Sequence, residues 1–218
     1  MTVMNAISIS KNWSYDWTMR VLGSAWFLLL ALAVAAKVGT SVSEPWPAIL
    51  SSFCLASFYT LLALLIMTRA PAKAQAEGFW PRAAAFAGTY LPWTITLFGK
   101  TEQALPNLAS TIFVLAGMMM MLVTIRHLGK SFSLVPQARS VVQTGPYRWI
   151  KHPLYFAEEI AIIGVVLQNP SLAAGIVLIV HIGIQVCRIH YEEDLLRRTC
   201  PEYTGYEAGR WRLIPFVW

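Results

Sequence analysis

The residues best suited to chemistry lie in one segment, which runs from Gly145 to Glu159 and reads GPYRWIKHPLYFAEE. It combines a Gly-Pro turn, an aromatic pair, three potentially cationic side chains and two adjacent carboxylates. Proline is favoured at the first position of a helix, so the spacing predicts a helix that begins at Pro153. The backbone N–H groups at such a start favour an anionic group, such as a carboxylate or a phosphate.

A second group of polar residues lies in the segment CRIHYEEDLLRRTCPEY, which begins at Cys187. Two of its three adjacent acidic residues have an arginine four positions later, the favourable order for charge pairs on a solvated helix. Glu192 differs, because Leu196 follows it by four residues and Arg188 precedes it by four. Its carboxylate is expected where the helix leaves the bilayer, so Glu192 is either part of a solvated extension or a functional group.

Composition places both segments in an integral membrane protein. Apolar residues make up 56% of the chain and charged residues 13%, about half the share of a typical soluble protein, and the mean hydropathy is +0.54. The net charge of +6 does not predict a nucleic-acid partner, because the basic residues lie between apolar segments instead of on one solvated face. No metal site is expected, because no C-x-x-C pair occurs and the His190–Glu193 spacing has no matching pair.

Apolar runs predict the membrane scaffold. Two are long enough to cross a hydrocarbon core of about 30 Å, and the third contains Pro92 and is expected to kink. The first run is expected to be a retained anchor, since polar residues precede it without a clear cleavage site. In chain order the four runs are Val21 to Val38, Pro47 to Met67, Ala83 to Phe98 and Leu108 to Ile125.

The motif segment opens directly into a short apolar hairpin. Leu154 to Leu167 is followed by a Gln-Asn-Pro turn and by the return segment Ser171 to Cys187. The first arm would be roughly 21 Å long as a helix, which is too short to cross comfortably. We therefore expect an all-α polytopic membrane protein, with about four transmembrane helices, a short helical hairpin and a cytosolic C-terminal helix and tail. Residues 1–127 would form the scaffold, and 128–218 one integrated functional domain.

The distribution of basic residues predicts the orientation. All 17 lysines and arginines except Lys37 and Lys100 lie in segments that this layout puts on one side. By the positive-inside rule, both termini, the motif segment and the tail are cytoplasmic. The tail beyond Pro201 is rich in aromatic residues and arginine, so it either lies along the interface or folds back over the motif segment to close a pocket.

These motifs together resemble a known family. The ordered set G-x-Y-x-x-x-K-H-P-x-Y, E-E-x-x-L, Y-x-x-Y and R-x-x-P is similar to the isoprenylcysteine carboxyl methyltransferase and phospholipid methyltransferase superfamily, in its bacterial type. The similarity covers about Leu128 to Pro215. It implies a multi-pass enzyme of the bacterial inner membrane that binds S-adenosylmethionine at its cytoplasmic face. The acceptor would be lipidic or apolar, either isoprenylcysteine carboxylate-like or phospholipid amine-like.

The resemblance also implies which residues form the site. Those expected to act in catalysis are Glu192, His152 and Arg188. Those expected to bind the cofactor are Tyr147, Lys151, His152, Pro153, Tyr155, Glu192, Glu193, Tyr203 and Tyr206. One departure concerns Lys151, because the family usually has arginine before the histidine. Lysine keeps the charge and loses the planar fork that binds a carboxylate through two parallel hydrogen bonds.

Two other functions fit parts of the pattern. A non-catalytic membrane subunit that retains the same fold is one alternative, made plausible by Lys151 and the short loops. A small transporter is disfavoured, because the polar residues gather at one face instead of along a path through the midplane.

Several residues inside the apolar runs also need an explanation. His181 is expected to hydrogen-bond another helix or to line the pocket. At least one of Glu158 and Glu159 is expected to face the pocket or to pair with a basic loop residue such as Arg148. The run Met118 to Met121 is expected to provide flexible packing.

Overall fold

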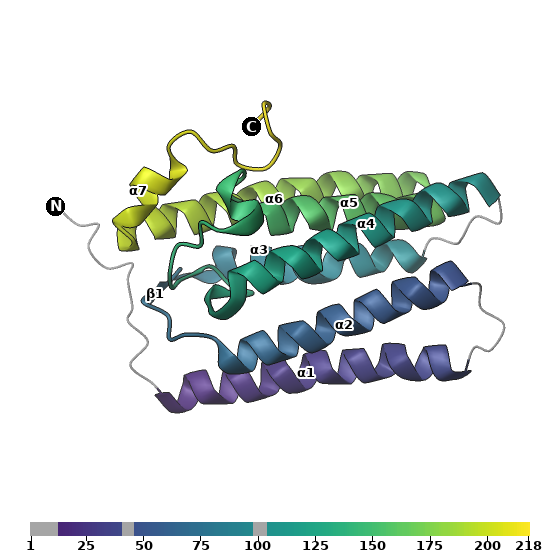
Figure 1. The fold of residues 1–218 in the computed structure, drawn as a ribbon, viewed down its shortest axis with the longest axis horizontal. Coiled ribbons are helices and arrows are strands. Elements are labelled where there is room, and N and C mark those ends of the chain that lie inside the picture. Colours follow the sequence, from purple (N-terminus) through teal and green to yellow (C-terminus); the bar gives the residue numbers. More distant parts are fainter. Residues whose placement is uncertain (1–12, 41–45, 98–103) are drawn as a thin grey trace.

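The computed structural model is a bundle of long helices that lie along one common direction (Figure 1). It describes residues 13–40, 46–97 and 104–218, so Lys11, Lys100 and Phe98 of the predictions above lie outside the described residues. The α-helices are α1 (Trp13–Thr40), α2 (Trp46–Thr68), α3 (Phe79–Tyr90), α4 (Ala104–Leu128), α5 (Pro153–Gln168), α6 (Leu172–Thr199) and α7 (Glu202–Glu207).

Short elements connect the helices at the end of the bundle where α5 begins and α6 ends, which we call the motif end. A two-stranded antiparallel ladder pairs β1 (Ala74–Gln75) with β2 (Gln137–Ala138). The 3-10 helices η2 (Gly129–Ser131) and η3 (Gly145–Arg148) also lie there, whereas η1 (Leu91–Leu97) follows α3 away from this end, and its Ile95 packs with Ala174 at the start of α6. The predicted all-α class is confirmed, since the described residues contain no other strand, only an isolated bridge between Ile150 and Trp211.

Among the described residues, four helices are long and apolar enough to cross a membrane, and they cover Asp16–Lys37, Ile49–Thr68, Leu108–Ser131 and Leu172–Thr199. Large apolar side chains on them face outward; Leu29 and Leu32 of α1, for example, are 61% and 65% exposed. Such surface is stable only against lipid, so the chain is an integral membrane protein. The third predicted run is not among these four spans. It forms the shorter α3 followed by the 3-10 helix η1, and α6 is the fourth span.

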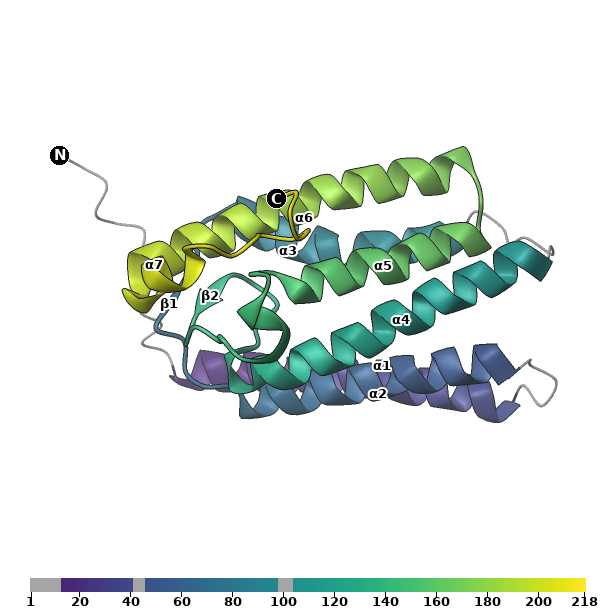
Figure 2. The same ribbon diagram turned by 45° about the horizontal axis from the view of Figure 1, so that its top comes forward.

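The hairpin of α5 and α6 is asymmetric. Helix α5 begins at Pro153, as predicted, and has 16 residues, whereas α6 has 28 and continues without a break through the acidic segment. Ser171 caps α6 by accepting a hydrogen bond from Ala174 N at 3.1 Å. Since each residue adds about 1.5 Å, α6 extends well past the start of α5 at the motif end, as Figure 2 shows.

Helices α4 and α5 pack at close range through small residues. An added Cβ on Gly117 would lie 2.5 Å from the backbone nitrogen of Ala161, and one on Gly164 would lie 2.7 Å from that of Val114. Small residues let membrane helices approach closely, and dispersion contacts and lipid release then favour their association. The position of α5, and with it the motif segment, is therefore set by this contact.

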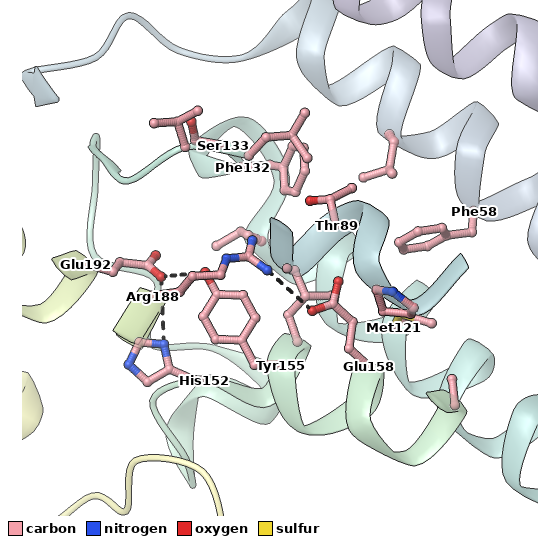
Figure 3. Close-up of a pocket in the computed structure, with 18 of the residues that line it drawn as sticks. Phe58, Thr89, Met121, Phe132, Ser133, His152, Tyr155, Glu158, Arg188 and Glu192 are labelled. Carbon is pink, nitrogen blue, oxygen red and sulfur yellow. Dashed lines mark hydrogen bonds and ion pairs between the residues drawn. The ribbon is translucent and has the colours of Figure 1, made fainter. Parts of the chain in front are cut away.

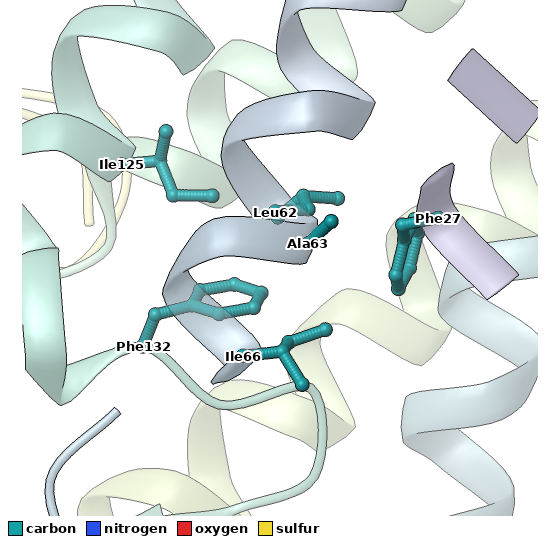
Figure 4. Packing of buried hydrophobic residues seen from close by; sticks show 6 residues of the cluster. All are labelled: Phe27, Leu62, Ala63, Ile66, Ile125 and Phe132. Carbon is teal, nitrogen blue, oxygen red and sulfur yellow. The ribbon is translucent and has the colours of Figure 1, made fainter. Parts of the chain in front are cut away.

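The loop between α4 and α5 is fastened to the bundle by Phe132. Its ring, 3% exposed, packs against Leu62, Ile66 and Ile125 in a cluster that also includes Phe27 of α1 (Figure 4). The β1–β2 ladder adds a second attachment, in which Lys73 N donates to Ala138 O at 2.8 Å. The loop is thus held on the motif end of the bundle.

A histidine in α6 compensates for the proline that ends α3. Pro92 has no N–H with which to bind the carbonyl of Gly88, four residues earlier, and its ring also opposes a continued α-helix there. His181 Nε2 lies 2.9 Å from Gly88 O, and Nδ1 lies 2.8 Å from Glu159 Oε1. The predicted hydrogen bond from His181 to another helix is thus present, and it joins α3, α5 and α6.

We predict that Gly117→Ala lowers the melting temperature of the detergent-solubilised protein, because the new methyl group would overlap the backbone of α5. Gly175→Ala in α6 is the matched control, since an added Cβ there meets no atom within 4 Å. Thermal unfolding followed by circular dichroism measures both. Equal melting temperatures for the two variants would contradict close packing at Gly117.

A second prediction concerns the Gly88 carbonyl, to which Pro92 cannot donate a hydrogen bond. His181→Ala should destabilise the protein by about 1 to 3 kcal/mol, the usual cost of leaving a buried polar group without a partner. Adding Pro92→Ala should recover part of this loss, because an alanine N–H can bind Gly88 O within a continued helix. The double-mutant cycle is measured by thermal unfolding, and strictly additive effects would show that His181 and Pro92 are not coupled.

Candidate functional site

A cavity of about 250 Å³ lies inside the bundle and extends from the motif end toward the interior. Helices α2, α4, α5 and α6 contribute to its wall, together with η1 and the loop after η2. Its inner part is apolar and is formed by Leu55, Phe58, Leu62, Met118, Met121 and Ile162, among others. Its outer part carries the polar side chains of the two motif segments (Figure 3).

The outer part is built from the start of α5 and one face of α6. His152 and Tyr155 stack with their rings nearly parallel, 5.6 Å between centroids and 5° between planes. Tyr155 donates its hydroxyl to Glu192 Oε2 at 3.0 Å, and His152 Nδ1 lies 3.8 Å from the same oxygen (Figure 3). The Glu192 side chain remains 35% exposed, so this carboxylate can accept further hydrogen bonds from a ligand.

A second polar layer lies one helical turn deeper. The Arg188 guanidinium lies over the Tyr155 ring at 4.6 Å and donates to Gln185 Oε1 at 2.9 Å. Glu158 Oε2 accepts a hydrogen bond from Gln185 Nε2 at 2.5 Å and is 3.8 Å from Arg188 Nη1. The buried Arg188 and the partly exposed Glu158 therefore form an ion pair at the wall of the cavity (Figure 3).

Glu193 has a different environment from its neighbour Glu192. Its side chain is 1% exposed and does not line the cavity. Lys151 Nζ lies 2.7 Å from Oε1 and His152 Nε2 lies 3.3 Å from it, while Arg197 and Arg212 approach Oε2 at 2.8 and 3.1 Å. A buried carboxylate needs this compensation, because an unpaired charge away from water is costly.

The tail folds back over the motif segment, the second of the two arrangements considered above. The backbone nitrogens of Lys151 and His152 donate to Trp211 O and Arg212 O at 2.9 and 3.0 Å. Tyr206 donates its hydroxyl to Tyr147 O at 2.8 Å. These bonds cover η3, and the resulting burial raises the pKa of the Tyr147 phenol well above its ordinary value. Tyr147 is therefore a neutral phenol at the wall of the cavity.

The structure brings most of the predicted site residues together. Those that line the cavity are Tyr147, Lys151, His152, Tyr155, Arg188 and Glu192. Four others lie behind this wall. Pro153 begins α5, Glu193 holds the surrounding basic groups, and Tyr203 and Tyr206 pack into an apolar cluster with Ala74 and Ala138 of the β ladder. Their contacts are with protein groups that support the cavity.

Other residues of the cavity carry no motif that sequence reasoning could have detected. The aromatic side chains Phe58, Tyr59 and Trp93 come from the predicted scaffold, and Ser133 and Gln137 from the loop. Met118 and Met121 both line the cavity and pack against α5. Glu158 was expected to face a pocket or to pair with a residue such as Arg148, and the structure pairs it with Arg188. Glu159 binds His181 instead.

The arrangement suits a ligand that is cationic and polar at one end and meets an apolar molecule at the other. Glu192 provides a partly exposed carboxylate for cationic groups. The inner apolar walls provide space for a hydrocarbon body. The fold and the site thus define a polytopic helical membrane protein with one cavity that joins the two environments.

Residues 110–198 match the sequence model of the isoprenylcysteine carboxyl methyltransferase (ICMT) family, which confirms the resemblance seen in the motifs. The match begins in α4 and includes the loop, α5 and nearly all of α6, while the tail that carries Tyr203, Tyr206 and Arg212 follows it. It indicates a membrane methyltransferase. A search of curated proteins finds no match for this chain.

We predict that Glu193→Gln loosens the tail, because it removes the carboxylate that binds the buried Lys151 at 2.7 Å and leaves only the more distant Glu207, at 3.9 Å. Removing one partner of a buried pair typically costs about 3 to 5 kcal/mol. The melting temperature should fall, and trypsin should cleave faster after Arg210 and Arg212. Asp194→Asn is the control, since Asp194 forms an exposed pair with Arg198. Unchanged cleavage in Glu193→Gln would mean that the tail is held by its backbone bonds alone.

Proposed function

We propose that the protein is an S-adenosylmethionine-dependent methyltransferase that modifies a lipidic or apolar acceptor at the cytoplasmic face of the membrane. The observation that supports this most directly is the cavity itself. One continuous space connects a carboxylate-bearing polar end, made from the two motif segments, with an apolar interior. An enzyme that joins a charged cofactor to a hydrophobic acceptor needs both environments in contact.

The side chains at the polar end fit the chemistry of S-adenosylmethionine. The cofactor carries a sulfonium, an ammonium and a carboxylate, and it supplies an electrophilic methyl group when bound. Glu192 is the partially exposed carboxylate available for the cationic groups. The phenol of Tyr147 and the ammonium of Lys151 are donors at the same end of the cavity.

Protein groups in this proposal act by orientation. Tyr155 and His152 hold the Glu192 carboxylate, while Glu193 fixes the Lys151–His152 corner from behind. Holding two reactants in line can contribute about 7 to 11 kcal/mol to lowering the barrier in favourable cases.

The departure at Lys151 is compatible with this proposal. Lysine retains the positive charge of the usual arginine, and its ammonium reaches Glu193 at 2.7 Å. A single strong contact of this kind does not require the planar fork of arginine. The cytoplasmic location of the motif end is supported by the basic residues gathered there, Arg20 and Arg69 among them, which share Asp16.

Binding of the cofactor tests the proposal. Isothermal titration of the detergent-solubilised protein with S-adenosylmethionine and S-adenosylhomocysteine should show saturable binding. Glu192→Gln should weaken S-adenosylmethionine at least tenfold, about 1.4 kcal/mol, because it removes the negative charge that faces the cationic groups. His152→Ala should weaken binding as well.

Glu202→Gln is the matched control, because Glu202 is exposed and lies away from the cavity. It should bind both compounds as the unmodified protein does. If a folded sample of the unmodified protein bound neither compound, the non-catalytic subunit would become the better explanation.

A further inference from the structure

The ion pair of Glu158 and Arg188 lies at the depth where the wall of the cavity changes from polar to apolar. Glu158 lies one turn inside α5 from Tyr155, and Arg188 lies one turn inside α6 from Glu192. Beyond them the α5 wall continues with Ala161 and Ile162, which are apolar. An acceptor with a hydrocarbon body in the inner part would therefore present its polar head to this pair.

The charges at this depth are already balanced. Arg188 is paired with Glu158, held by Gln185 and stacked on Tyr155. Lys151, the other strongly basic side chain at the wall, is bound by Glu193. Within the described part of the chain, the cavity wall thus offers no cation free to bind an anionic head group, while Glu158 and Glu192 both present carboxylates to it.

A carboxylate acceptor would meet strong repulsion here. It would bring a further negative charge close to Glu158 and Glu192 without a free cation to compensate it, and like charges at this range repel. A hydroxyl or an amine would instead donate a hydrogen bond to Glu158, whose side chain is 25% exposed. The two carboxylates also attract a protonated amine, which must transfer a proton to Glu158 before its nitrogen has the lone pair needed for attack.

We propose that Glu158 selects the methyl acceptor, and that the acceptor is an apolar molecule with a hydroxyl or amine head group instead of a carboxylate. This inference rests on the proposed function. The acceptor oxygen or nitrogen forms its bond to the methyl carbon as the carbon–sulfur bond of S-adenosylmethionine breaks, and that electron pair stays on sulfur. The proton of the acceptor passes to the Glu158 carboxylate, so charge and atoms balance.

Three probes with the same alkyl chain test the inference: tetradecanol, tetradecylamine and myristate. Each is added to the solubilised protein without cofactor, and the melting temperature is measured. The alcohol or the amine should raise it and myristate should not. In the presence of S-adenosylmethionine, mass spectrometry should detect the methyl ether or the N-methylamine. Stabilisation by myristate alone, or by none of the probes, would overturn the inference.

Glu158→Gln should reverse the preference. Loss of its charge leaves Arg188 free to bind an anion, so myristate should bind at least tenfold more tightly than to the unmodified protein. Methylation of the preferred probe should fall at least tenfold, and the affinity for S-adenosylmethionine should be retained. Glu159→Gln is the matched control, since this neighbouring carboxylate binds His181 and does not line the cavity. An unchanged preference in Glu158→Gln would show that Glu158 does not select the acceptor.

The methyltransferase assignment and the selection of the acceptor by Glu158 can be refuted separately. If calorimetry shows no binding of S-adenosylmethionine, the methyltransferase assignment fails whatever the probes do. If the cofactor binds and myristate is the methylated probe, the assignment stands and the selection by Glu158 is wrong.

Discussion

The burial of the Glu193 carboxylate is the interaction on which the motif end depends. A charge removed from water is stable only when opposite charges and hydrogen bonds surround it. Its partners come from separate parts of the chain: Lys151 and His152 precede α5, Arg197 is on α6, and Arg212 is in the tail. Because these segments share one counter-ion, the displacement of any one of them removes part of the compensation of this buried charge.

The contacts of Glu193 also determine the orientation of the neighbouring Glu192. Successive residues on a helix point about 100° apart, so fixing Glu193 toward the loop and the tail turns Glu192 toward the cavity. Glu192 is left with Tyr155 and the more distant His152 as its close polar neighbours among the described residues. A pair of carboxylates that looks redundant in the sequence thus separates into a structural charge and a ligand-facing charge.

Hydrophobic runs and the proline corner were enough to predict the helical membrane class and the start of α5 at Pro153, because both follow from local physics. The pairing of Arg188 with Glu158 could not be predicted, since it depends on how α5 and α6 pack. Pro92 predicted a kink in the third apolar run, but the sequence did not show that α3 ends there and is followed by a 3-10 helix. It is the tertiary bond from His181 that allows the Gly88 carbonyl to remain buried. Likewise, Phe58 and Met121 of the scaffold carry no motif, so their place at the cavity required the fold.

The backbone bonds from Lys151 and His152 to Trp211 and Arg212 also bear on biosynthesis. Residues 211 and 212 leave the ribosome only after α6, so the helices enter the bilayer before the corner that precedes α5 has its partners. Until then Lys151 and His152 must rely on water for their N–H groups. The polar end of the cavity is thus completed only after the tail residues 211 and 212 have been added to the chain.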